Sequence, residues 1–184
     1  SSAASDVYKR QVSLLQGLED AGFKLNAGLT DFYTAYRSDR PNVGMWEQDW
    51  TLPEPLKESY TSELMADAKA FSDTALIVIT RVGGEGADLP TDVSAVTYTD
   101  NSAEYKDFET GEHYLQLSRT EKDMVDLVCS NFDNVVLVYN GANAMELGFV
   151  NDYSQIKSAI WCPGTGQSGF EALGEIVSGA VNPS

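Results

Sequence analysis

One carboxylate in this sequence stands among three glycines, because Glu85 follows Gly83 and Gly84 and precedes Gly86. Glycine lets the backbone turn tightly and leaves room for a ligand to approach the chain. A lone carboxyl group held in such a loop is well placed to act on a bound molecule, and the chemistry it offers is proton transfer. The alternative is an ordinary turn whose acid is solvated, and the loop alone does not decide between the two.

The loop follows a run of β-branched and apolar residues, Ala75 to Ile79. A continuous apolar run of this length that ends at glycine predicts a strand buried on both faces. In open α/β sheets, ligands bind in the loops just past the carboxyl ends of such strands. The predicted strand therefore places Glu85 where a site is expected.

Further strands and helices are predicted to alternate along the chain. Besides 75–80, the apolar runs predict strands at 135–139 and 158–162 and a short one at 23–26. Apolar residues at helical spacing predict helices at 12–21, 30–36, 62–71, 118–130 and 167–178, and a short one from residue 143. This alternation predicts an α/β fold, a three-layer α/β/α sandwich with a mostly parallel sheet.

Particular residues mark the expected helix ends. Thr30 and Ser62 are each predicted to cap the N-terminus of a helix, and Gly22 is predicted to end the first one. Ser118 and Glu121 have the spacing of a capping box. The helix that starts at Ser62 is expected to bury one face, formed by Leu64, Met65, Ala68 and Phe71.

The charge of the chain narrows its range of partners. The 184 residues carry 28 acidic against 12 basic side chains, a formal net charge of -16. Such a field repels nucleic-acid phosphates and anionic membrane surfaces, so we expect neither nucleic acid nor a membrane as a partner. No stretch approaches the ~18 apolar residues of a membrane span. No signal peptide is visible, which favours a cytoplasmic location.

The sequence contains few residues that could bind a metal. Cys129 and Cys162 stand in a helical and a strand pattern, which is typical of small buried apolar residues and not of a disulfide framework or metal site. The single histidine, His113, has no partner for a His-centred metal site or triad. We therefore expect no metal and no cofactor.

Two long loops carry further candidate residues. The loop at 42–55 contains Trp46 and Trp50, whose flat apolar faces can stack on sugar rings; the alternative is that they cover the side of the core. The polar insertion at 91–117 is either a lid over the site or a solvated excursion.

A glycine-rich segment at 164–169 spells G-x-G-x-x-G between a predicted strand and a helix, which is the dinucleotide-binding pattern. It follows the last strand instead of opening a βαβ unit, and the acid expected ~20 residues further on is not present. Nucleotide binding is therefore the weakest of the functional alternatives.

Three patches carry a family resemblance. They are the loop RVGGEGADLP at 81–90, the segment VVLVYNGANAMEL at 135–147, and the closing segment from Trp161, with its W-x-P-G pattern and its final N-P-S. In this order they resemble the C-terminal α/β sandwich domain of family 3 glycoside hydrolases, the β-glucosidase family. The resemblance covers about 75–184, and the closing segment is its most specific part.

The resemblance implies a retaining glycosidase that hydrolyses O-glycosidic bonds of a carbohydrate substrate, a β-glucoside or related oligosaccharide. Glu85 matches the position of the family's acid/base in many members, and Arg81 and Asp88 are placed to orient it or the sugar. The family's aspartate nucleophile comes from a preceding barrel domain, whose motif is not found here. This chain alone is then expected to be inactive.

The resemblance also implies the domain organisation. Residues 1–11 look foreign to the rest and are interpreted as a tail of non-native origin, whereas 12–184 form the sandwich domain. The family's first strand is not found before Val12, and the family continues past Ser184, so we expect a fragment truncated at both ends. The main functional alternative is a non-catalytic sugar-binding or interaction domain.

Overall fold

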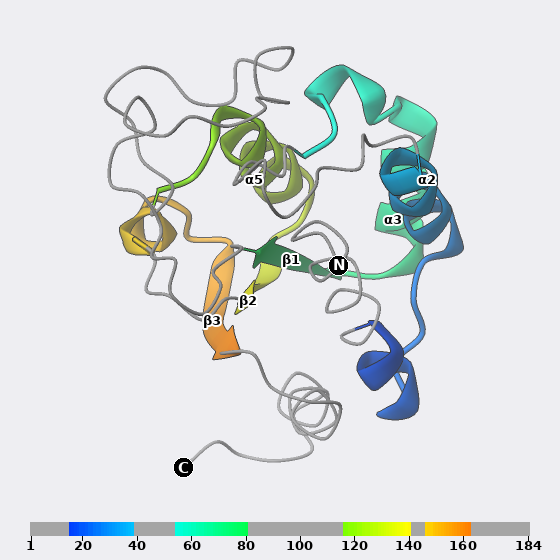
Figure 1. Ribbon diagram of the computed structural model, residues 1–184, viewed down its shortest axis with the longest axis horizontal. Coiled ribbons are helices and arrows are strands. Elements are labelled where there is room, and N and C mark those ends of the chain that lie inside the picture. The colour runs from blue at the N-terminus through cyan, green and yellow to red at the C-terminus, as the bar shows by residue number, and fades with distance from the viewer. Residues whose placement is uncertain (1–14, 39–53, 81–115, 141–145, 163–184) are drawn as a thin grey trace, which may run out of the picture.

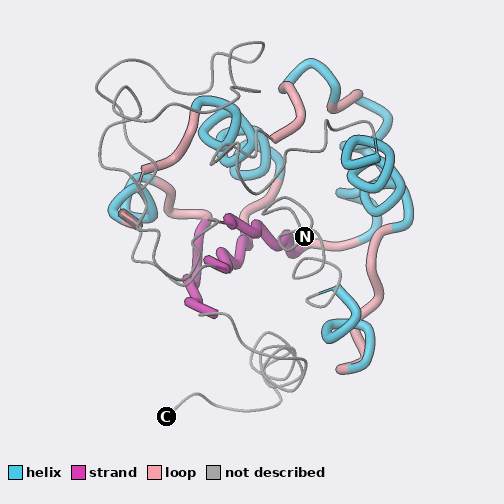
Figure 2. The backbone as a smooth tube through the Cα atoms, viewed as in Figure 1, coloured by secondary structure: helices cyan, strands magenta, loops and turns pink. Residues whose placement is uncertain are grey.

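The computed structural model describes residues 15–38, 54–80, 116–140 and 146–162. After a helical segment at 15–20, the elements follow in the order α2 (Ala27–Ser38), η1 (Lys57–Ser59), α3 (Ser62–Phe71), β1 (Thr74–Thr80), α5 (Arg119–Asn131), β2 (Asn134–Asn140), η3 (Gly148–Asp152) and β3 (Ile156–Cys162). Figure 2 shows the helices arranged around the three strands.

The three strands form one parallel sheet in the order β1-β2-β3 (Figure 1). β1 and β2 pair without a shift, whereas the β2–β3 pairing is irregular between Val135 and Val136. All three strands were predicted from apolar runs, although β3 begins at Ile156, ahead of the predicted position 158.

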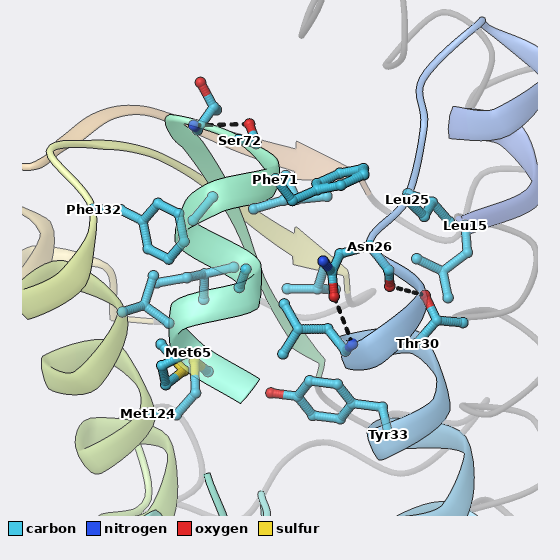
Figure 3. Close-up of a pocket in the computed structure, with 18 of the residues that line it drawn as sticks. Leu15, Leu25, Asn26, Thr30, Tyr33, Met65, Phe71, Ser72, Met124 and Phe132 are labelled. Carbon is cyan, nitrogen blue, oxygen red and sulfur yellow. Dashed lines mark hydrogen bonds between the residues drawn. The ribbon is translucent and has the colours of Figure 1, made fainter. Parts of the chain in front are cut away.

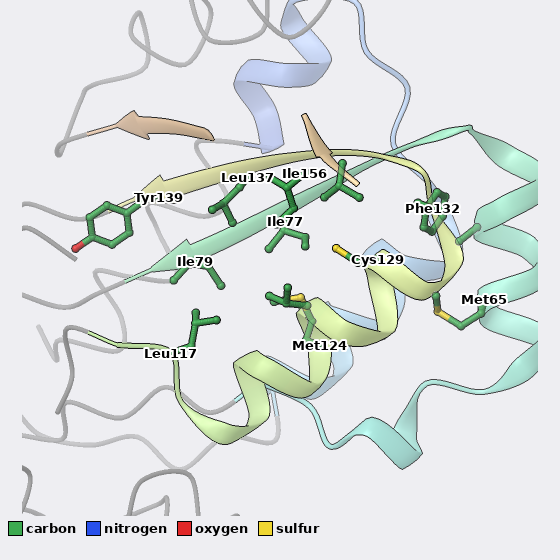
Figure 4. Close-up of a cluster of buried hydrophobic side chains, with 13 residues drawn as sticks. Met65, Ile77, Ile79, Leu117, Met124, Cys129, Phe132, Leu137, Tyr139 and Ile156 are labelled. Atoms are coloured by element: carbon green, nitrogen blue, oxygen red, sulfur yellow. The ribbon is translucent and has the colours of Figure 1, made fainter. Parts of the chain in front are cut away.

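The core lies on both faces of the sheet. On one face, Ile77, Leu137 and Tyr139 pack with Met124 of α5 and with α3 (Figure 4). On the other face, Leu18 of the helical segment at 15–20 packs with the strand residues of a second cluster, among them Val136 and Val138. Helices on both faces of a parallel sheet confirm the predicted α/β sandwich.

The helix α5 begins at the predicted capping box. The Ser118 hydroxyl accepts a hydrogen bond from the Glu121 N–H at 3.2 Å, and the Glu121 carboxylate accepts one from the Ser118 N–H at 2.8 Å. Met124, Val125 and Cys129 then recur at helical spacing and are buried. Cys129 is a free buried thiol, as predicted, and the side chain of Cys162 lies outside the described residues.

The starts of two helices differ from the prediction. Asn26, not Thr30, caps α2, because its side-chain oxygen accepts a hydrogen bond from the Leu29 N–H at 2.8 Å. Thr30 lies in the first turn, where its hydroxyl donates to the Asn26 carbonyl. Thr61, one residue before Ser62, caps α3 by accepting from the Leu64 N–H. Asn and Thr are both good caps, so composition alone did not separate the competing positions.

The predicted strand at 23–26 is wrong, because no strand is formed there. The Phe23 N–H instead donates to the Leu18 carbonyl, which completes the end of the helix at 15–20 after Gly22, whose φ is +94°. No strand of the described chain lies beside 23–26 to form a ladder with it. Gly22 does end the helix, as predicted.

The buried face of α3 is narrower than predicted. Met65 and Ala68 are buried and Leu64 is half-buried, but Phe71 is 47% exposed. Phe71 stands at the C-terminal end of the helix, where the chain turns toward β1, and its ring lies beside a cavity. The described part of the chain contains no helix long and apolar enough to cross a membrane and no cluster of potential metal ligands.

Candidate active site

The carboxyl ends of the three strands form one row of the sheet. Thr80 of β1 pairs with Asn140 of β2, which pairs with Cys162 of β3. Ligands bind at this edge in parallel α/β sheets. The candidate active site is therefore this edge together with the segments that follow it.

The residues predicted from the sequence for this site lie outside the described residues: Glu85, Arg81, Asp88, Trp46 and Trp50. The same holds for His113, the glycine-rich segment at 164–169 and the insertion at 91–115. Their roles therefore stay predictions. What the structure describes is the end of β1 at Thr80, from which the chain continues toward Glu85.

At this edge the last apolar residues of β1 and β2 are buried. Ile79, Leu137 and Val138 are 0% exposed, and Tyr139 is 2% exposed. Close packing of this kind leaves side chains and backbone little freedom. The chain therefore leaves Thr80 from a fixed position, and catalytic groups need such a rigid support to hold their geometry.

One aromatic residue at this edge was not predicted as a site residue. Trp161 pairs in register with Tyr139, and Tyr139 with Ile79, so the three share one face of the sheet. Ile79 and Tyr139 are buried there, whereas Trp161 is 54% exposed. In the sequence, only the W-x-P-G pattern drew attention to Trp161. Its exposure follows from the position of β3 in the strand order, and the apolar run at 158–162 does not reveal that order.

The described residues also line an open cavity of about 600 Å³ that contacts β1 but not β2. Its walls are β1 residues 74–78, the segment 23–26, and parts of α2, α3 and α5. Figure 3 shows Phe71 of α3 near Leu25, and Met65 and Met124 at another side. The lining is mainly apolar, so this cavity differs in character from a site for proton transfer.

A group of aromatic residues lies at one end of this cavity. The hydroxyl oxygens of Tyr33 and Tyr60 are 2.6 Å apart, and the Phe32 ring packs against Tyr60 with centroids 4.9 Å apart. Burial, and next the nearby Glu54 carboxylate, raise the pKa of the Tyr60 phenol. Tyr60 therefore stays protonated over the physiological range and can serve as a neutral donor.

Comparison with known proteins gives consistent results over almost the whole chain. The model of the glycosyl hydrolase family 3 C-terminal domain matches residues 2–184. Beta-glucosidase A of Butyrivibrio fibrisolvens is 33% identical over 162 residues, which are 83% of this chain and 18% of the relative. A beta-glucosidase of Ruminococcus albus is 26% identical over 174 residues, which are 92% of this chain and 16% of the relative.

A plant relative and a solved structure agree with these matches. A probable beta-D-xylosidase of Arabidopsis thaliana is 32% identical over 128 residues, which are 69% of this chain and 15% of the relative. The solved structure of a beta-glucosidase from Paenibacillus barengoltzii superposes with a TM-score of 0.68 at 26% identity, over 93% of this chain and 17% of that one. The chain thus spans less than a fifth of the length of each of these proteins.

Proposed function

The chain belongs to the glycosyl hydrolase family 3 C-terminal domain family. On this premise we propose that residues 12–184 are the truncated sandwich domain of a retaining β-glucosidase-like enzyme. In this proposal Glu85 is the acid/base of that enzyme. The observation that supports the proposal is that β1 ends at Thr80 on a close-packed edge of the sheet, and the chain continues directly into the loop containing Glu85.

The proposed mechanism needs two carboxyl groups ~5 Å apart on either side of the glycosidic bond. Glu85 protonates the leaving oxygen while a second carboxylate attacks the anomeric carbon, and Glu85 then takes a proton from the water that releases the sugar. The second carboxylate comes from a barrel domain outside residues 1–184. Arg81 and Asp88, which flank Glu85 in the same loop, orient it or the sugar.

Aromatic residues complete the proposed substrate site. Trp46 and Trp50 provide flat apolar faces on which sugar rings can stack. The substrate is a β-glucoside or a related oligosaccharide.

The substitution Glu85→Gln in the longer enzyme tests this function. Glutamine cannot donate the proton, so hydrolysis of an unactivated disaccharide should fall far more than formation of the glycosyl-enzyme from an activated aryl glucoside, whose leaving group needs little protonation. Azide, which attacks without a base, should restore turnover and yield a β-glycosyl azide. The matched control is Glu19→Gln, which changes an exposed carboxylate on the helix at 15–20. Equal losses for both substrates without an azide product would leave a non-catalytic sugar-binding or interaction domain.

A further inference from the structure

Trp161 is an exposed aromatic residue near the carboxyl end of β3, at the edge of the sheet where ligands bind in parallel α/β folds. Its side chain is 54% exposed, whereas its register partner Tyr139 is 2% exposed. Tryptophan has a large, flat apolar surface and gains much from covering it. An exposed tryptophan beside the proposed active site is therefore a candidate for contact with a ligand.

A bulge in β3 determines the face of the sheet on which Trp161 lies. The pairing with β2 passes from Ile156 directly to Ser158, so Lys157 is the extra residue of the bulge. An extra residue turns the later side chains of a strand to the opposite face. The Lys157 side chain is held at this point, because its Nζ donates a hydrogen bond to the Ser154 carbonyl at 2.8 Å.

The packing of two isoleucines agrees with this change of face. Residues 156 and 160 are separated by an even number of positions and would share one face in a regular strand. Ile156 packs in the cluster with Leu137, whereas Ile160 packs in the cluster with Val138 on the other face. Trp161 therefore lies on the face of Ile156, and without the bulge it would lie on the opposite one.

The bulge does not serve to bury Trp161. Along its row of the sheet, Ile79 and Tyr139 are buried in the core, and the row becomes exposed at β3. Bulges are over-represented next to active sites, where they turn a side chain toward a new direction. The bulge at Lys157 has this effect on the aromatic residue that lies beside the carboxyl edge.

The position of Trp161 indicates which part of a substrate it would contact. Neighbouring strands are ~4.8 Å apart, so the backbone at Trp161 lies about 10 Å from that at Ile79 across two strand pairings. This separation exceeds the width of one pyranose ring. A substrate that reaches from the end of β1 to Trp161 therefore contains more than one ring.

We propose that Trp161 is a stacking platform for a sugar ring of an oligosaccharide, remote from the bond that is cleaved, and that it sets a preference for oligosaccharides over glycosides with one sugar ring. This inference rests on the proposed function, because it takes the carboxyl edge as the substrate site. The indole ring would cover the apolar face of the remote sugar and be covered by it. Binding energy from that ring would be available only to the longer substrate.

Kinetics of the longer enzyme with two substrates test this role. Methyl β-glucoside has one sugar ring, and a β-linked glucose trisaccharide has three. Trp161→Leu keeps an apolar side chain but removes the ring, so it should raise KM for the trisaccharide at least about fivefold at nearly unchanged kcat. The kcat/KM for methyl β-glucoside should not change, and Trp161→Phe should retain most of the affinity for the trisaccharide. An unchanged ratio of the two kcat/KM values in Trp161→Leu would overturn the proposal.

The substitution Glu85→Gln separates this inference from the proposed function. Both substrates have leaving groups that need protonation, so Glu85→Gln should lower both rates to a similar extent. Unchanged rates would refute the acid/base assignment alone. The ratio of kcat/KM for the two substrates in Trp161→Leu would still decide whether Trp161 binds a sugar ring.

Phe71 provides the matched control, because its side chain is 47% exposed but stands at the end of α3, just before β1 begins. Phe71→Leu should leave the ratio of the two kcat/KM values unchanged. A change as large as that of Trp161→Leu would show a general effect of losing an exposed ring and would contradict the proposal. Equal losses for both substrates in Trp161→Leu, with a lower unfolding temperature, would show that Trp161 packs against another part of the enzyme and would also overturn it.

Discussion

The hydroxyl of Tyr33 in α2 lies 2.6 Å from the hydroxyl of Tyr60, which directly follows η1, so one hydrogen bond joins two helical segments at the apolar cavity. We predict that Tyr33→Phe lowers the free energy of unfolding by about 1 kcal/mol, because it leaves the Tyr60 hydroxyl without this partner. Denaturant unfolding measures the loss. In a double-mutant cycle with Tyr60→Phe, the second substitution should cost less once the first is present; additive losses would show that the bond contributes nothing.

The capping box of α5 should contribute measurably to stability. Ser118 is 2% exposed, and Ser118→Ala removes the acceptor of the Glu121 N–H. We expect a loss of about 1–2 kcal/mol in the free energy of unfolding, seen as a lower denaturant midpoint at unchanged slope. The control is Ser130→Ala near the other end of α5, where the hydroxyl is exposed and donates only to the Asp126 carbonyl. Similar losses for the two variants would contradict a specific role of the cap.

The thiol of Cys129 should react slowly in the folded chain. Burial, and next the carboxylate of Asp126, raise its pKa, so less thiolate is present at a given pH and the packing of α5 limits access. Peptide mapping after iodoacetamide treatment at pH 8 should find Cys129 unlabelled in the native chain and labelled in denaturant. Equal labelling under both conditions would show that α5 opens readily.

The raised pKa of Cys129 also predicts how the stability of the folded chain varies with pH. Because the pKa of Cys129 is higher in the folded than in the unfolded chain, the folded chain binds more protons once the pH exceeds the unfolded value of ~8.5. The stabilisation that Cys129 contributes to the folded chain is complete below that pH. It is lost as the pH rises toward the pKa of Cys129 in the folded chain. Unfolding midpoints between pH 8 and pH 10 should therefore fall less steeply in Cys129→Ala. An unchanged slope would argue against the shift.

The 184 residues alone should not hydrolyse an aryl β-glucoside. In the proposed mechanism the nucleophile lies on another domain, so no glycosyl-enzyme can form on this chain. The measurement is release of the aryl group above the buffer rate. Turnover that Glu85→Gln abolishes would show that this chain contains the complete site and that the domain assignment is wrong.

The strands β1 and β2 were predictable from sequence because their burial produces continuous apolar runs. Residues 75–79 and 135–139 are continuous apolar runs, and the structure extends each of them only at the ends. The same rule failed at 23–26, since a strand also needs a neighbour to pair with and sequence pattern does not show whether one is present. The choice between Asn26 and Thr30 as a cap depended on the local path of the chain.

The candidate site was predictable only in part. The glycines around Glu85 and the family patches indicated the carboxyl edge of the sheet, and the register of Thr80 with Asn140 describes that edge. The exposure of Trp161 was not predictable, because it depends on which of the described strands lies last in the row. The apolar cavity was also missed, since its lining comes from segments that no sequence pattern connects.

The separations between contacting residues also bear on the order in which the domain folds. Tyr153 donates a hydrogen bond to Asp126 across 27 positions, whereas Asn134 donates one to Thr74 across 60. Closing the longer loop costs about 0.6 kcal/mol more chain entropy, since the separation is roughly doubled. The unit from α5 to β3 should therefore assemble first, and β1 should join it afterwards. The strand that leads toward Glu85 would then be added to a preformed half of the sheet, so the support of the proposed site would be completed last.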